Sequence, residues 1–205
     1  MRDRRSRRSH TALLNAAVAL VTERGTTSIS VLELAESADV SRQLVYQKFA
    51  DKDALLLEAA LDLARKELVP QLLGGPETVA APGRRSQVLA LATHFAKYRS
   101  FYRAMLTGSC AYAFKVAIFE LLTPISWLRN SEKFGKQLDP CLVKDLSTYM
   151  TGGANAMINE WVIDGGDPLD PEHFTDRLMR ILPMMLDNRP ETSPTTIPPA
   201  EGGVR

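Results

Sequence analysis

The chain has 205 residues, 45% of them hydrophobic, and a formal net charge of +1, which is typical of a soluble protein with one large or two small domains. Its two cysteines, Cys110 and Cys141, are too few and too far apart for a disulfide framework or a zinc site. A membrane span is not expected, because no segment reaches the roughly 18 apolar residues that one requires.

The amino terminus superficially resembles a signal peptide. The apolar run from Ala12 to Val21 follows a basic start, but Asn15 interrupts it and no convincing cleavage site follows. We therefore expect the protein to remain in the cytoplasm.

Five arginines stand among the first eight residues, where Asp3 is the only acid. One interpretation is a solvated, disordered tail. The other is a basic arm, residues 1–8, that lies in a minor groove or along phosphates and adds salt-sensitive affinity for DNA. The helices that follow the arm favour the second interpretation.

The segments after the arm predict one long helix and then two short ones. Residues from Ser9 to Glu23 place apolar side chains at helical spacing, and Gly25 ends that helix. Ser30 and Glu33 form a capping box that begins the second helix. At Asp39 the chain must reverse through a left-handed backbone conformation, which Asp tolerates better than most residues.

Ser41 is the predicted cap of the third helix, whose outward side chains are mainly hydrogen-bond donors. Such a helix suits the major groove, because Arg and Gln can bind base edges while Lys, Tyr and Ser reach phosphates. A phosphate can also bind the free N–H groups behind Ser41, and Lys52 is predicted to clamp the flanking phosphate. The predicted DNA-binding residues are Arg5, Arg7, Arg8, Ser30, Ser41, Arg42, Gln43, Tyr46, Gln47, Lys48 and Lys52.

From Arg7 to about Leu57 the chain resembles the TetR family of bacterial transcriptional regulators. The resemblance lies in the motifs Glu23-Arg24-Gly25, Ser30-Val31, Leu34-Ala35, Val40-Ser41, Val45-Tyr46-x-x-Phe49 and Lys52-x-x-Leu55. Asp39 stands where the family usually has Gly, and Leu44 stands where it usually has a small hydroxyl residue. The second departure removes a phosphate or base contact, for which Gln43 is the candidate replacement.

The resemblance implies an all-α protein. Its N-terminal three-helix helix-turn-helix DNA-binding domain would be joined by a connecting helix to a C-terminal helical ligand-binding and dimerisation domain. The expected divisions are the arm at 1–8, the DNA-binding domain at 9–50, the connecting helix at 51–69, the effector and dimer domain at 70–186, and a disordered tail at 187–205. Within the second domain we expect a loop over residues 70–83 and helices over 84–97, 100–106, 109–128, 140–163 and 171–186.

The second domain carries candidate residues for a pocket and for an interface. Aromatic and sulfur side chains at helical spacing are more often plain core, yet as a group they are the best candidates for lining an apolar or aromatic effector site. The predicted pocket residues are His94, Tyr98, Tyr102, Met105, Phe114, Phe119, Trp127 and Asn155. The resemblance implies pairing through the last two long helices, which gives the predicted interface residues Met150, Ala154, Met157, Trp161, Leu178 and Leu182.

Gly152 and Gly153 stand inside a predicted helix, where each costs roughly 1 kcal/mol relative to Ala. Close approach of a neighbouring helix is the favoured reason, and an opening for a ligand cavity is the alternative.

Other site chemistry is not expected. His94 and His173 lack the spaced partners of a metal site, and no nucleophile, phosphate loop or carboxylate pair predicts catalysis or a cofactor. The predicted function is a homodimeric regulator, most simply a repressor, that binds a palindromic double-stranded DNA operator and is released by a small effector. One alternative is a regulator without an effector, whose second domain serves dimerisation or a protein partner. A helical enzyme and a nonspecific architectural protein are more remote alternatives.

Overall fold

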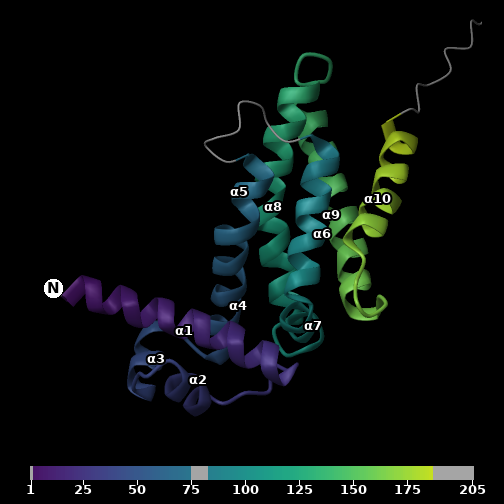
Figure 1. Ribbon diagram of the computed structural model, residues 1–205. Helices are drawn as coiled ribbons and strands as arrows, with labels where there is room; N and C mark the ends of the chain where they lie inside the picture. The colour runs from purple at the N-terminus through teal and green to yellow at the C-terminus, as the bar shows by residue number, and fades with distance from the viewer. Residues whose placement is uncertain (1, 75–82, 187–205) are drawn as a thin grey trace, which may run out of the picture.

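The computed structural model describes residues 2–74 and 83–186, and all of their regular structure is helical. A small domain at one end carries an upright bundle (Figure 1). The helices are α1 (Arg2–Arg24), α2 (Val31–Ser37), α3 (Arg42–Lys48), α4 (Lys52–Leu63), the π-helical turn η1 (Ala64–Leu68), α5 (Val69–Leu73), α6 (Arg84–Lys97), α7 (Arg99–Thr107), α8 (Ala111–Phe134), α9 (Pro140–Asp164) and α10 (Pro171–Leu186). The all-α prediction is confirmed, while the tail predicted to be disordered lies outside the described residues.

Helices α1 to α4 form the small domain around one apolar core. Leu13, Ala17, Leu34, Val45 and Leu55 are all buried there. The helix α1 lies across α4 and contacts α2 as well (Figure 1). The core therefore holds the short α2 and α3 in place, since helices of this length are not stable on their own in water.

The first helix is longer than the sequence predicted. It begins at Arg2, so residues 2–8 of the predicted basic arm form its first turns. Lys48 at the end of α3 donates a hydrogen bond of 2.8 Å to Ser6 Oγ, which ties this extension to the rest of the small domain.

The connecting helix also extends beyond the predicted loop boundary at residue 70. From α4 the chain passes through η1 into α5, and the helix ends at Leu73, where Gly74 takes a φ of 84°. Pro70 is tolerated because it stands in the first turn of α5, where a backbone N–H group is not needed. Part of the expected loop, residues 75–82, lies outside the described residues.

Helices α6, α8, α9 and α10 form the upright bundle, with α7 at its lower end (Figure 1). The closest packing in the bundle is between α8 and α9, while α10 rests against α6. The helix α8 runs on to Phe134, beyond the predicted end at Leu128, and carries Pro124 in its interior on the exposed side.

Within the described residues, α8 is long and apolar enough to cross a membrane by length and composition alone. The sequence analysis did not expect such a helix. One helix of this kind is weak evidence for a membrane, since helices of soluble proteins pass the same test. Val116 and Trp127 on α8 are exposed in the single protomer, so this helix presents apolar side chains on the surface.

The small domain and the bundle meet at the corner between α7 and α8. Ser100 donates to the Thr22 carbonyl at 2.7 Å, and Ser109 donates to Asp53 Oδ1 at 3.0 Å. A Cβ atom on Gly108 would lie 2.1 Å from Thr27 Oγ1, so only glycine fits there. These contacts make the corner a close-fitting joint between the two parts.

Candidate DNA-binding site

The start of α2 has the predicted capping box. Glu33 N donates to Ser30 Oγ at 3.1 Å, and Ser30 N donates to Glu33 Oε2 at 2.8 Å. These hydrogen bonds, with Arg24 nearby, lower the pKa of Glu33. Because the Ser30 hydroxyl also contacts Glu33, it is already engaged within the protein although it is exposed.

The turn between α2 and α3 has the predicted left-handed residue. Asp39 has a φ of 51°, and Val40 N donates to the Ala35 carbonyl at 2.9 Å, which closes the turn. Ser41 then caps α3 by accepting a hydrogen bond of 3.3 Å from Leu44 N. Both predictions from the sequence are confirmed at this turn.

The outer side of α3 is a row of polar side chains. Val45 and Phe49 are buried and Leu44 is half-buried, so the rest of the short helix turns outward. Tyr46 is 63% exposed. The residues predicted to contact DNA on this helix are exposed, apart from the half-buried Lys48: Ser41, Arg42, Gln43, Tyr46, Gln47 and Lys48.

Lys52 is held within the protein. Its Nζ donates to the Thr27 carbonyl at 2.8 Å and lies 3.8 Å from Asp53 Oδ1. An ammonium group has three donors, so these contacts leave it able to reach a phosphate as well. Lys52 therefore has a structural role beside the predicted one, at the joint between α4 and the loop before α2.

The predicted arm residues lie on the first turns of α1. Arg7 and Arg8 are exposed there, and the side chain of Arg5 lies outside the described ones. Arg7 and Arg8 therefore stand on a helix that is linked to α3 by the hydrogen bond from Lys48 to Ser6.

A cavity of about 380 Å³ lies in the bundle between α6, α8, α9 and α10. Its wall is mainly apolar, with Leu91, Phe95, Ile125, Met157 and Ile158 among the lining residues. The size falls within the range of small-molecule sites, which is about 300 to 1,000 Å³. The polar lining includes Arg84, Gln87, Ser126, Arg129, Asn130, Thr151 and Asn155.

Of the residues predicted to line a pocket, only Asn155 lines this cavity. The others include a packed aromatic cluster, in which His94 Nε2 lies 2.7 Å from Tyr102 Oη and Tyr102 stacks on Phe114. Burial lowers the pKa of His94 to about 4, so its imidazole is neutral in this cluster. Among the rest, Tyr98 donates to Glu67, Met105 is buried, Phe119 is half-buried and Trp127 is largely exposed.

The cluster forms because the polar atoms of His94 and Tyr102 pair with each other and the rings pack together. Sequence spacing identified the aromatic residues but not which side of each helix borders the empty space. The cationic lining residues Arg84 and Arg129 were missed, since isolated arginines on amphipathic helices usually lie in solvent.

Most of the predicted interface residues contact the interior of the protomer. Met150, Ala154, Met157 and Leu178 line the cavity. Trp161 stacks on Phe174 with ring centroids 4.4 Å apart. The side chain of Leu182 lies outside the described ones. Within the single protomer this apolar stripe packs against the bundle, and pairing through these residues stays a prediction.

Gly152 and Gly153 have space around them within the protomer. A Cβ atom on Gly152 would make an ordinary contact of 3.8 Å with Phe119, and one on Gly153 would meet nothing within 4 Å. Gly153 also lines the cavity, so neither glycine is required by another helix of the same protomer.

Across residues 2–74 and 83–186, no group of three or more potential metal-binding side chains comes together. Both cysteines are free thiols, with Cys110 buried and Cys141 exposed.

Comparison with known proteins agrees with this geometry. Residues 13–59 match the family described as bacterial regulatory proteins, tetR family. No curated protein matches the chain. Several solved structures share its fold, although they are too distant in sequence to show more than the fold.

The structure of the dihydroxyacetone kinase operon activator DhaS is similar with a TM-score of 0.62 and 15% identity, over 87% of this chain and 96% of that one. A TetR-family transcriptional regulator from Rhodococcus sp. has a TM-score of 0.57 and 16% identity, over 86% and 97% of the two chains. The TetR family repressor AlkX from Dietzia sp. strain DQ12-45-1b has a TM-score of 0.53 and 16% identity, over 87% and 95%.

The matched segment covers α2, α3 and most of α1 and α4, and the shared fold covers the bundle as well. Taken together, the helix pair and the family match identify residues 13–59 as a helix-turn-helix domain of the tetR family of bacterial regulatory proteins, and the solved structures show that the whole chain shares the fold of such regulators.

Proposed function

We propose that the protein is a repressor that binds a palindromic operator as a homodimer and leaves it when a small effector fills the bundle cavity. The fold itself allows either sign of regulation, because both an activator and a repressor share it. Repression is the simpler assignment, since a dimer bound across a promoter blocks it by occupancy alone. The protein would act in the cytoplasm, where the operator lies.

The outer side of α3 is the proposed reading surface. Arg42 and Gln43 carry donors suited to base edges, and Tyr46 can reach a phosphate or a base. All three are exposed in the free protein, so no side chain must leave an internal partner before DNA binds.

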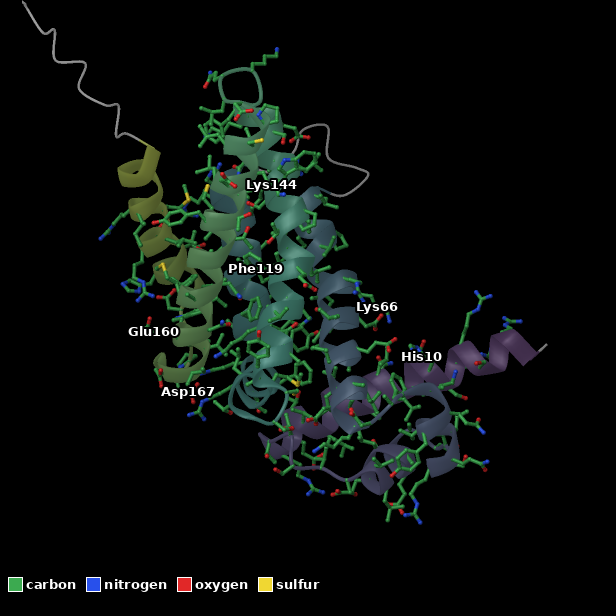
Figure 2. All side chains as sticks on the ribbon, turned by 180° about the vertical axis from the view of Figure 1, so that it is seen from behind. His10, Lys66, Phe119, Lys144, Glu160 and Asp167 are labelled. Carbon is green, nitrogen blue, oxygen red and sulfur yellow. The ribbon has the colours of Figure 1, made fainter. Side chains whose placement is uncertain are left out.

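The proposed dimer contact is the outward side of α9, with the adjoining residues of α8. Leu142, Leu146, Tyr149, Gly153 and Ala156 alternate four and three residues apart, which is the spacing of a helix that packs along another helix. Leu142 is 51% exposed and Tyr149 is 67% exposed. Figure 2 shows the molecule from behind, with Phe119 on α8 beside α9.

A second copy on this surface would cover the apolar residues of α8 and use the open space at Gly153 for close approach. Sedimentation of Tyr149→Glu tests the contact, with exposed Leu32→Glu on α2 as control. We expect monomers only for the first variant, and a dimer that survives Tyr149→Glu would place the contact elsewhere.

The cavity is the observation that favours an effector over the alternative of a regulator without one. A domain used only for dimerisation would be expected to fill its interior, because empty apolar space costs packing energy. Two recognition helices must enter successive major grooves about 34 Å apart, so a ligand that changes their separation weakens both contacts. A coupling of about 1 to 3 kcal/mol changes operator affinity by about 5- to 150-fold.

Filling the cavity tests the effector role. Ala154→Leu should place extra carbons in the cavity, whereas Ala113→Leu adds the same atoms on the exposed side of α8. Operator binding should persist in both variants. Small molecules extracted from cells should release DNA from Ala113→Leu but not from Ala154→Leu. Equal release from both would contradict the cavity as the effector site.

A further inference from the structure

Arg84 is an incompletely compensated charge in the cavity wall. It stands at the start of α6, half-buried, and its Nη2 donates to Asn130 Oδ1 at 3.1 Å. Its Nη1 lies 3.8 Å from the Met150 sulfur, which is a weak acceptor. Burial lowers the pKa of this guanidinium.

Two other arginines, Arg85 and Arg129, differ from Arg84 because each forms an ion pair with a carboxylate. Arg85 pairs with Glu172 at 2.7 Å and Asp176 at 2.8 Å, and Arg129 pairs with Glu132 at 3.0 Å. Among residues 2–74 and 83–186, no carboxylate forms an ion pair with Arg84. A charge removed from water without a partner is costly, so this position favours an anion supplied from outside.

Other donors in the same wall lack acceptors. Arg129 Nε and Thr151 Oγ1 are both buried without a hydrogen-bond partner in the described part of the chain, and both residues line the cavity. No described lining residue is acidic. This combination excludes a cationic ligand on electrostatic grounds.

The remaining wall is mainly apolar, although Gln87, Ser126 and Asn155 also line it. Val88, Leu91 and Phe95 follow Arg84 along α6, while Leu122, Met157 and Ile158 lie across the cavity on α8 and α9. A ligand that fills the space therefore meets charge at one end and hydrocarbon along the rest. Burial of apolar surface would supply binding energy, and the charged end would fix the orientation.

We propose that the cavity binds a small amphipathic carboxylate, with its carboxylate on Arg84 and its apolar chain or ring along α6 towards Phe95. The proposal rests on the proposed function only in taking this cavity as the effector site. A carboxylate matches the planar fork of a guanidinium, and the pairing is stronger than a neutral hydrogen bond. The ligand would replace Met150 as the partner of Arg84.

Direct binding to the full-length protein without DNA tests this ligand class. Calorimetry with octanoate, octanol, octylamine and octyl phosphate compares head groups on the same chain. We expect octanoate to bind at least about tenfold more tightly than octanol, which corresponds to about 1.4 kcal/mol. Equal affinity for octanol, or tighter binding of octylamine, would overturn the proposal, and a preference for octyl phosphate would overturn the carboxylate assignment.

Arg84→Gln should reduce octanoate affinity by about tenfold or more and leave octanol affinity unchanged. Arg85→Gln, which removes the same charge one residue away on the exposed side, should bind octanoate as the wild type does. Arg84→Lys keeps the charge and should retain part of the affinity, and thermal melts report whether each variant is folded. An equal loss in Arg84→Gln and Arg85→Gln would contradict a direct contact.

Operator release is measured separately, so that the two proposals can fail independently. Octanoate binding without release of DNA would support the ligand class and contradict the effector role of the cavity. Release by neutral compounds of the same length, but not by octanoate, would contradict the ligand class and leave the effector role standing.

Discussion

Asp39 shows how one residue fixes the relation between α2 and α3. Its φ of 51° is a left-handed conformation that costs an L-residue about 1 to 2 kcal/mol, less for Asp than for most others. The sequence predicted this conformation because the chain must reverse at Asp39 and Asp tolerates the left-handed region better than most residues. The stability of the turn before α3 therefore depends on how well residue 39 tolerates a left-handed backbone conformation.

Replacement of Asp39 by Val should lower the free energy of unfolding by about 1 to 2 kcal/mol, since β-branched residues avoid this conformation. Asp39→Gly should be neutral or stabilising. Urea denaturation measures both, with Glu36→Val on the exposed side of α2 as control. A loss at Asp39→Val no larger than that of the control would contradict the strain at this turn.

His94 links stability to pH. Its pKa is lowered by burial to about 4, against about 6.5 in an unfolded chain, so the unfolded state binds more protons between these values. The contribution of neutral His94 is complete above about pH 6.5 and is lost as the pH falls towards 4. Glu67 opposes this shift and Lys97 reinforces it.

Between pH 7 and pH 5, the free energy of unfolding should therefore fall by about 1 to 2 kcal/mol less in His94→Gln than in the wild type. Urea titrations at the two pH values measure the difference. Exposed His173→Gln serves as control and should keep the wild-type pH dependence. An unchanged pH dependence in His94→Gln would show that the imidazole does not remain neutral in the folded protein.

At the scale of the element, the helix starts could be predicted and some helix ends could not. Ser30 and Ser41 both cap helices as expected, because a cap is a contact within a few residues. The passage through η1 into α5 and the extension of α8 to Phe134 were not predicted. The caps depend on local chemistry, whereas these helix ends depend on packing against residues that are distant in the sequence.

The candidate sites divide in the same way. The exposed side of α3 follows from the two caps and the buried positions between them. The cavity depends on which sides of α6, α8 and α9 fail to meet, and no pattern within one helix specifies that. Arg84 can be recognised as a residue of the cavity wall only when the positions of Asn130 and Met150 beside it are known.

Substitutions of Ser41 can separate the stability of α3 from its affinity for DNA. Ser41→Ala removes the cap and should cost about 1 kcal/mol of stability, whereas Ser41→Asp keeps a cap of similar strength. Because Asp brings a negative charge towards DNA phosphates, Ser41→Asp should fold normally and still lose most operator affinity. Thermal melts and DNA-binding assays on both variants check this, and full affinity in Ser41→Asp would place the start of α3 away from the DNA.

At the scale of the whole molecule, the corner at Gly108 joins the bundle to the small domain. A Cβ atom there would lie 2.1 Å from Thr27 Oγ1 and 2.8 Å from the Ala104 carbonyl oxygen. Any change in the bundle that moves this corner must move Thr27, whose carbonyl holds Lys52. The corner thus joins the cavity domain to the small domain by direct contact.

Gly108→Ala should destabilise the protein by about 1 to 3 kcal/mol, as overpacking of a close contact does. Thr27→Ala should recover part of that loss, because it removes one of the two clashes. A double-mutant cycle by urea denaturation measures the coupling. Additive effects of the two substitutions would mean that the small domain and the bundle do not meet closely at this corner.

The central claim is that α3 reads a specific sequence. The most direct test is to select genomic fragments on the purified protein at moderate salt and to sequence those retained, with Arg42→Gln beside Arg65→Gln, which removes an exposed charge from η1. We predict that the wild type and Arg65→Gln recover one palindromic site whose half-sites lie one helical turn apart, and that Arg42→Gln loses it. Fragments without a shared motif, or equal recovery by both variants, would contradict the claim.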